Sequence, residues 1–334
     1  MRTVQRLRVA TAVGAVALLS AACGGGGSAG GVGEPGADGA TTVQVAFNPA
    51  SQFAPMFVGM EKGIFAEHGL KLEIVPQTDI AAIISGLASG QYDFGFATAV
   101  HLVNARSNNI PVRAVATPDG QQATAEDPEM GNALVAGPNS GVTGPGDLGG
   151  KTLAVVGLSS LNTLAAQELA ARAGVDVGTI KLVQMPFGQM PAALAAGDVD
   201  AAVVQSPFIA EALADGSSVV AKPNVELFAD EAVGMFLTSE ATIGESEEAV
   251  RGFAAAMVES QRYAAEHVDE ARSTLVAHMG MTPDAAAAAT WCTTCDPALD
   301  TEGIDTVQEL MTKYAGLEEP IDVQEAVWPE ALTY

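Results

Sequence analysis

The chain has 334 residues, with 40 acidic and 15 basic side chains and three cysteines. Binding to nucleic-acid phosphates requires clusters of Lys and Arg, which this sequence lacks, so nucleic acid is excluded as a partner. About 290 residues follow the N-terminal segments described next, enough for two lobes of ordinary domain size.

The first residues have the features of an export signal. Basic residues precede an apolar run, Val9–Leu19, that is shorter than the roughly 20 residues of a transmembrane helix. Small residues then precede Cys23 in a pattern that resembles a bacterial lipoprotein cleavage box, although Ser20 stands where such boxes prefer an aliphatic residue. We expect residues 1–22 to be a lipoprotein signal peptide and Cys23 to be lipidated. Secretion without a lipid is the alternative.

A Gly-rich segment, residues 23–42, has no apolar periodicity and is predicted to be a flexible tether. The folded part then begins with a strand at Val43–Phe47. A helix starts near Pro55 and stops at Gly63, with Pro first and Gly last as is usual at helix ends. In Lys71–Val75 apolar and charged residues alternate with the period of a strand.

The next residues complete a βαβ unit, which implies a parallel sheet. Asp79 is a good N-cap, and apolar residues from Ile80 to Leu87 recur at helical spacing until Gly90. An extended apolar run, Tyr92–Phe96, follows.

The second half of the chain repeats this arrangement. Gly86–Gly95 and Ala193–Ala202 both contain a helix end, a Gly, a polar residue and an Asp that enters a strand. Each half therefore contains the same kind of βαβ unit. The second-half elements are predicted at Thr152–Val156, Leu161–Ala173, Ile180–Met185, Pro191–Ala196 and Val199–Val204.

Two short apolar runs, Ala133–Ala136 and Val233–Thr238, are predicted to be the crossings between two lobes. The first lobe is then discontinuous, with residues 43–136 as its first part, 137–232 as the second lobe, and 233–334 as the return. The return is helical, with charges on one side and apolar residues on the other. Its helices are predicted at Glu247–His267, Asp269–Met279, Pro283–Thr290 and Thr301–Tyr314.

Three stretches resemble a known family. APMFVGMEKGIFAEHGLKLEIV at Ala54–Val75, DLGGKTLAVV at Asp147–Val156 and MPAALAAGDVDAAVVQSPF at Met190–Phe208 are similar to solute-binding proteins of ABC importers for nitrate, sulfonates, taurine and pyrimidine thiamine precursors. The resemblance implies the α/β periplasmic-binding-protein type 2 fold: two lobes, each a mostly parallel sheet flanked by helices, with the ligand cleft between them. It places the C-terminal helices in the first lobe.

The same resemblance implies a function outside the cytoplasm. The protein would be a monomer, and the lipid expected on Cys23 from the N-terminal residues would hold it at the outer face of the cell membrane. It would capture a small molecule and deliver it to an ABC permease that a separate ATPase drives.

Uncharged polar residues gather at the predicted C-terminal ends of strands in both halves. Open α/β sheets bind ligands at such ends, and several of these residues also start helices, whose backbone N–H groups would point into the cleft. Each residue alone is as well explained as a helix cap, but their clustering in both halves favours a site. The candidate ligand-binding residues are Asn48, Ser51, Gln52, Phe53, Gln77, Thr78, Asp79, Thr98, Ser159, Ser160, Asn162, Phe187, Gln189, Gln205 and Ser206.

None of the Lys and Arg residues of the mature chain falls on these loops. Without an Arg fork, nitrate or a sulfonate would depend on helix N-termini alone. We therefore favour a neutral or weakly basic heterocycle such as a pyrimidine precursor, with an anion as the alternative. The candidate stacking faces are Phe47, Phe53, Phe187 and Phe208.

The sequence does not favour an enzyme. Gly157–Leu161 begins like a nucleophile elbow but ends in Leu where that turn requires Gly, and no two of the four His have the spacing of metal ligands. Pyrimidine synthases that share this family's fold use, as the resemblance implies, a Cys-rich iron motif and a sacrificial His. No Cys lies between Cys23 and Cys292, so that motif is missing. We expect a binding protein with no catalytic residue, metal or cofactor; such a synthase and an extracytoplasmic sensor are the alternatives.

The remaining cysteines, Cys292 and Cys295, follow a Trp in a Trp-Cys-x-x-Cys motif. A thioredoxin-type redox site requires this motif to open a helix after a strand, whereas here it follows an Ala-rich helix. In an exported protein we expect a local structural disulfide instead.

Overall fold

The structure is a computed structural model. It describes residues 36, 39–118, 131–206, 208–228, 231, 233–287, 289, 291 and 297–333. The predicted signal peptide, Cys23, and the pair Cys292 and Cys295 lie outside these residues and stay predictions. No helix of the described part is both long enough and apolar enough to cross a bilayer.

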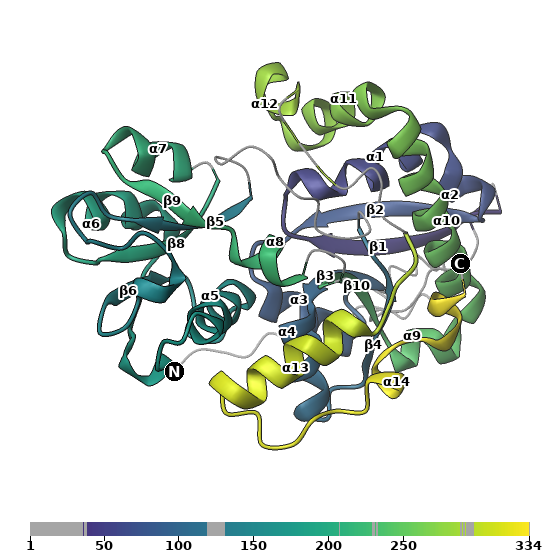
Figure 1. Ribbon diagram of the computed structural model, residues 1–334. Coiled ribbons are helices and arrows are strands. Elements are labelled where there is room, and N and C mark those ends of the chain that lie inside the picture. The colour runs from purple at the N-terminus through teal and green to yellow at the C-terminus, as the bar shows by residue number, and fades with distance from the viewer. Residues whose placement is uncertain are drawn as a thin grey trace, which may run out of the picture.

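Two five-stranded sheets form the centres of two lobes, which lie side by side in Figure 1. The sheet of the first lobe has the order β2-β1-β3-β10-β4, with β1, β2 and β3 parallel and β10 antiparallel to both of its neighbours. The strands are β1 (Thr41–Phe47), β2 (Leu70–Pro76), β3 (Phe94–Thr98), β4 (Val112–Ala116) and β10 (Gly234–Ser239).

The sheet of the second lobe repeats this plan in the order β7-β6-β8-β5-β9, with β5 as its antiparallel strand. The strands are β5 (Asn132–Ala136), β6 (Thr152–Val155), β7 (Lys181–Gln184), β8 (Ala201–Gln205) and β9 (Ser218–Ala221). The fold is therefore the two-lobed, mostly parallel α/β arrangement expected from the sequence.

Two predicted boundaries are wrong. β5 pairs with β8 and β9, so Asn132–Ala136 belongs to the second sheet and not to a first lobe ending at residue 136. The first strand starts at Thr41, inside the segment 23–42 predicted as tether, because Thr41 and Thr42 already pair with β2. Both segments look like connections in the sequence, and only their strand partners assign them.

Helices surround both sheets. Those of the first lobe are α1 (Ala54–Lys62), α2 (Ile64–Glu67), α3 (Ile80–Ala88), α4 (Ala99–Ser107), α9 (Glu240–Glu245), α10 (Glu247–Glu266), α11 (Val268–Met279), α12 (Pro283–Ala287), α13 (Glu302–Tyr314) and α14 (Val323–Ala326). Those of the second lobe are α5 (Leu161–Arg172), α6 (Met190–Ala196), α7 (Phe208–Ala214) and α8 (Pro223–Phe228).

The repeated Asp of the two βαβ units has the same role in both lobes. A carboxylate oxygen of Asp93 accepts a hydrogen bond from the Gln44 backbone N–H at 2.7 Å, and Asp200 does the same for Thr152 at 2.8 Å. Gln44 lies in β1 and Thr152 in β6, the strand that starts each parallel unit. The sequence repeat therefore marks the tie between the third strand and the first.

Helix α5 packs against the hydrophobic cores of both lobes. Ala166 and Ala170 pack in the core of the second sheet, whereas Leu161, Leu164 and Ala165 pack in the large core of the first lobe. Helix α13 contacts both α4 and α5, so the C-terminal region touches the two lobes at once.

The contact between α5 and α13 is centred on Glu168, whose side chain is only 12% exposed. Its Oε2 accepts hydrogen bonds from Lys313 Nζ and Tyr314 Oη, each at 2.7 Å, and its Oε1 accepts one from Arg172 Nε at 3.0 Å. Burial opposes ionisation of Glu168, but these hydrogen bonds together outweigh it and hold its pKa below the usual value. A negative charge on Glu168 therefore joins the two helices.

We predict that Glu168→Gln lowers the free energy of unfolding by about 1.5–3 kcal/mol, because a hydrogen bond to a charged group is worth that much and Gln removes the charge. Urea unfolding at pH 7 measures it. Since the folded pKa of Glu168 is depressed, its contribution is complete above the ordinary value of 4.5 and is lost as the pH falls through the lower folded value.

The matched control is Glu247→Gln. Glu247 pairs with Arg251 one turn along α10, and both side chains are more than half exposed. Such pairs contribute about 0.3–0.5 kcal/mol. Equal effects of the two substitutions would show that Glu168 does not join the lobes.

Candidate ligand-binding site

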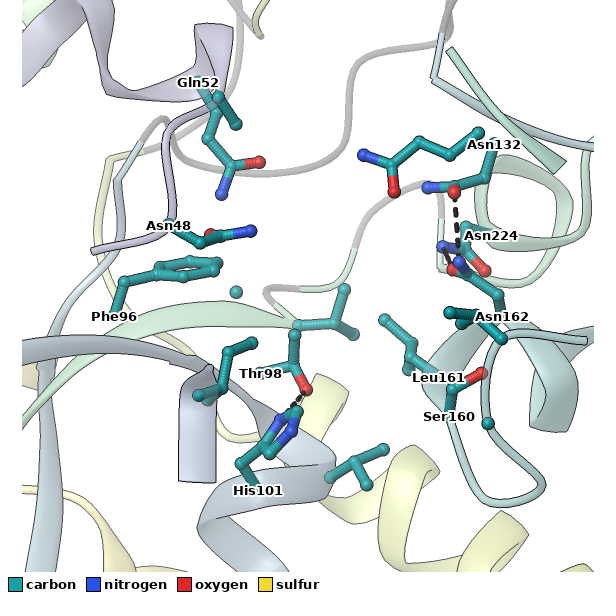
Figure 2. A pocket seen from close by; sticks show the side chains of 18 of the residues that line it. Asn48, Gln52, Phe96, Thr98, His101, Asn132, Ser160, Leu161, Asn162 and Asn224 are labelled. Carbon is teal, nitrogen blue, oxygen red and sulfur yellow. Dashed lines mark hydrogen bonds between the residues drawn. The ribbon is translucent and has the colours of Figure 1, made fainter. Parts of the chain in front are cut away.

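A cavity of about 460 Å³ lies between the lobes, within the size range of small-molecule sites. Residues at the carboxyl ends of parallel strands line it: Asn48 follows β1, Thr98 ends β3, Gly157 follows β6 and Gln205 ends β8. Figure 2 shows Asn48, Gln52 and Phe96 on one wall and Asn132, Asn162 and Asn224 on the other. The cavity therefore occupies the edge where open α/β sheets bind ligands.

The antiparallel strands contribute their beginnings to the same edge. Asn132 is the first residue of β5 and Gly234 the first of β10, and both line the cavity. An antiparallel strand starts where its parallel neighbours end, so its first residues meet their last ones.

Eight of the predicted ligand contacts line the cavity, from both lobes. They are Asn48, Gln52, Thr98, Ser159, Ser160, Asn162, Phe187 and Gln205. Whether they bind a ligand stays a prediction.

Seven predicted contacts are not among the lining residues. They are Ser51, Phe53, Gln77, Thr78, Asp79, Gln189 and Ser206. Asp79 caps α3 by accepting hydrogen bonds from the N–H groups of Ala81 and Ala82, and Gln77 accepts one from the Asp79 N–H. Asp79 is therefore a helix cap, and the Gln77 side chain supports the capping residue.

The aromatic prediction needs a correction. Phe53 and Phe47 are buried in the first-lobe core with their rings 4.8 Å apart, so neither ring faces a ligand. Phe53 is the last residue of the short 3-10 helix Ser51–Phe53, and its side chain is the buried one of that helix. Phe96, which the sequence analysis did not select, lines the cavity together with Phe187 of the second lobe.

Four polar lining residues were missed: His101, Asn104, Asn132 and Asn224. His101 and Asn104 lie one turn apart on α4, and Asn224 lies on α8. Helix residues of this kind carry no strand-end signal. Asn132 could have been found by searching the residues that begin, as well as end, predicted strands.

Two helices point their N-terminal ends at the cavity from opposite lobes. Thr98 is the N-cap of α4 and Ser160 that of α5, where its hydroxyl accepts a hydrogen bond from the Thr163 N–H. Free N–H groups and the helix dipole make such ends favourable for acceptor atoms or partial negative charge.

The lining has no Asp, Glu, Lys or Arg among the described residues, so His101 is its one titratable group. Burial lowers the pKa of His101 below its usual 6.5, and the nearby Asp79 carboxylate opposes this only in part. His101 Nδ1 lies 2.8 Å from Thr98 Oγ1. At pH 7 the described part of the lining is therefore polar and uncharged.

We predict that His101 titrates with a midpoint below 6.5, because burial disfavours the charged ring. The unfolded chain then binds the proton more readily, so stability is complete above about pH 6.5 and falls as the pH drops toward the folded pKa. NMR of the His101 ring protons measures the midpoint, with His101→Gln identifying the signal. A midpoint at or above 6.5 would contradict the neutral cavity.

Among the described residues, no three His, Cys, Asp or Glu side chains gather in a way that could hold a metal ion.

The fold is that of periplasmic binding proteins. The aliphatic sulphonate binding protein SsuA from Escherichia coli superposes with a TM-score of 0.68 at 15% identity, covering 88% of this chain and 99% of that one. The ligand binding component of an ABC-type import system from Staphylococcus aureus also gives 0.68 at 15%, covering 87% and 97%.

The chain belongs to the NMT1/THI5 like family, whose model matches residues 50–271. A curated relative is the 4-amino-5-hydroxymethyl-2-methylpyrimidine phosphate synthase of Legionella pneumophila, 27% identical over 131 residues. That match spans 39% of this chain and 38% of the relative.

Proposed function

We propose that this protein is the extracytoplasmic solute-binding component of an ABC importer, which captures a small molecule and delivers it to a membrane permease. The observation that carries the proposal is the cavity itself, lined by residues from both lobes. The periplasmic-binding-protein fold of its structural neighbours supports it.

The ligand we favour is a neutral or weakly basic heterocycle of the thiamine-pyrimidine type. A neutral His101 and ten side-chain amides or hydroxyls suit a ligand that needs hydrogen bonds rather than charge. These amides and hydroxyls are Asn48, Gln52, Thr98, Asn104, Asn132, Ser159, Ser160, Asn162, Gln205 and Asn224. Phe96 and Phe187 offer aromatic faces from the two lobes. The pyrimidine named for the curated relatives is the obvious probe.

We predict that Asn48→Ala and Gln205→Ala each weaken binding of 4-amino-5-hydroxymethyl-2-methylpyrimidine about tenfold to a hundredfold, because each leaves a buried polar atom of the ligand unpaired. Isothermal titration calorimetry measures this. Gln189→Ala is the control, since Gln189 is exposed and does not line the cavity.

Closure of the two lobes on the ligand, which we call the two-lobe clamp, can be measured separately. If the lobes close on the ligand, the radius of gyration from small-angle scattering decreases when the probe is added. An unchanged radius, together with a loss of binding from substitutions in one lobe only, would replace the clamp by a single-lobe site.

An anion is the second candidate ligand. The N-terminal ends of α4 and α5 favour it, and a structural neighbour is named as a sulphonate binder. The lining residues that the structure describes include no Lys or Arg to neutralise the charge, which is why the heterocycle comes first. Competition between the pyrimidine and taurine in the same titration separates the two.

A synthase is the remaining biochemical alternative, because the curated relatives are named as synthases. The proposed function requires that a bound pyrimidine be released unchanged and that none be formed by the protein. Mass spectrometry of the protein after expression, and of its incubated ligand, tests both points. An extracytoplasmic sensor would bind in the same way, and genes for a permease and an ATPase beside its own would favour the importer.

The location outside the cytoplasm, the monomeric state and the lipid anchor are part of the proposal. We predict that Cys23 carries the lipid, because a short apolar run and small residues precede it. Metabolic labelling with an alkyne fatty acid should mark the wild type and leave Cys23→Ser unmarked. Equal labelling of both would refute the anchor.

A further inference from the structure

Three asparagine side chains of the second lobe form a chain of hydrogen bonds at the cavity wall (Figure 2). Asn224 Nδ2, on α8, donates to Asn162 Oδ1 at 2.5 Å, and Asn162 Nδ2, on α5, donates to Asn132 Oδ1 at 3.0 Å. All three residues line the cavity. We call Asn224, Asn162 and Asn132 the asparagine relay.

The orientations of the three amides in the relay depend on one another. An amide can turn over and exchange its nitrogen with its oxygen, but here one turned amide would bring two like groups together, so all three must turn at once. The relay therefore has two states. In one, Asn132 offers its nitrogen to the cavity; in the other, it offers its oxygen.

The inner end of the relay decides between the two states. Asn224 is only 3% exposed, and its Oδ1 has no hydrogen-bond partner among the described residues. Reversal would place the Asn224 amide nitrogen, which carries two N–H donors, in this buried position. Proteins tolerate a buried unpaired carbonyl oxygen better than a buried unpaired N–H, so we infer that the observed direction is the favoured one.

The outer end consequently presents a donor. Asn132 Oδ1 is used by Asn162, which leaves its nitrogen for the cavity, and Figure 2 shows that nitrogen facing the open space. On the opposite wall Asn48 also turns its nitrogen toward the cavity, while its buried Oδ1 has no hydrogen-bond partner among the described residues. Donors thus meet the same space from both lobes.

We propose that the asparagine relay sets the hydrogen-bond polarity of the cavity, so that the site selects neutral ligands with acceptor atoms on two opposite edges. Asn132 and Asn48 are the contacting donors, and Asn224 is a positioning residue that acts on Asn132 through Asn162. This inference rests on the proposed function, since it describes the ligand of the same cavity.

The binding test compares three probes. They are 4-amino-5-hydroxymethyl-2-methylpyrimidine and its two pyridine analogues, in each of which one ring nitrogen is replaced by C–H. The wild type should bind at least one analogue about tenfold to a hundredfold more weakly than the pyrimidine, because a donor of the cavity is left unpaired. The measured quantity is this ratio, rather than the affinity for any one probe.

Two variants address the two ends of the relay. Asn132→Asp keeps the oxygen that accepts from Asn162 and replaces the donor by an acceptor, so the ratio should fall to one or below. Asn224→Leu removes the group that holds the direction, so Asn132 can turn over and the ratio should fall several-fold. Asn104→Leu is the matched control: Asn104 lines the cavity from α4 outside the relay, and its variant should keep the ratio even if all affinities change.

A measurement on the ligand-free protein makes the relay testable without binding. In NMR spectra, Asn224→Leu should shift the side-chain amide signals of Asn132, although Asn162 lies between them, and Asn104→Leu should leave those signals in place. Unmoved Asn132 signals in Asn224→Leu, or a wild-type ratio in that variant, would overturn the relay. If none of the three probes binds, the proposed ligand class fails, and the amide signals alone decide on the relay.

Discussion

The burial of one helix, α5, in two hydrophobic cores is the constraint on which the rest of the structure depends. Leu161 and Leu164 pack in the first-lobe core, and Ala166 and Ala170 in the core of the second lobe. Burying a Leu side chain contributes about 1.5–3 kcal/mol, so the two leucines give the lobes a substantial shared contact. The same helix begins at the cavity and carries Glu168, which joins it to α13. Helix α5 therefore contacts both lobes, forms part of the cavity wall and binds the C-terminal region.

This arrangement bears on the lobe closure that we propose. Packed cores do not deform continuously, so we expect closure to keep the contacts of α5 with both cores. The cavity wall that carries Asn48 and Gln52 faces the wall that carries the asparagine relay (Figure 2). We therefore expect closure to change the distance between these two walls more than the contacts within the relay.

The chemistry of the cavity is separate from the charge of the molecule. The chain is strongly acidic, yet the described residues that line the cavity carry no formal charge at pH 7. For the ligand site that we propose, we therefore expect selectivity to come from the direction of hydrogen bonds and from aromatic contact. This chain shares its fold with a sulphonate binder, while its curated relatives are named as pyrimidine phosphate synthases. The side chains of a site, and not the fold, decide which ligand it takes.

The sequence by itself determined the repeated βαβ units, because hydrophobic period, Gly at helix ends and an Asp entering a strand are local signals; Asp93 and Asp200 indeed make matching hydrogen bonds. It also predicted that Asn48, Thr98 and Gln205 lie together, since residues that end parallel strands meet at one edge, and all three line the cavity. It assigned β5 to the wrong lobe, did not identify the short strand β9, and placed Phe53 in the site.

Contacts between segments distant in sequence decide the features that the sequence did not predict. These features are the partners of each strand, the side to which a ring turns, and the helix residues that face a cavity. Only the tertiary structure, through the seating of α5 between the lobes, brought Asn132, Asn162 and Asn224 together opposite Asn48, because no local pattern encodes a distance between two lobes.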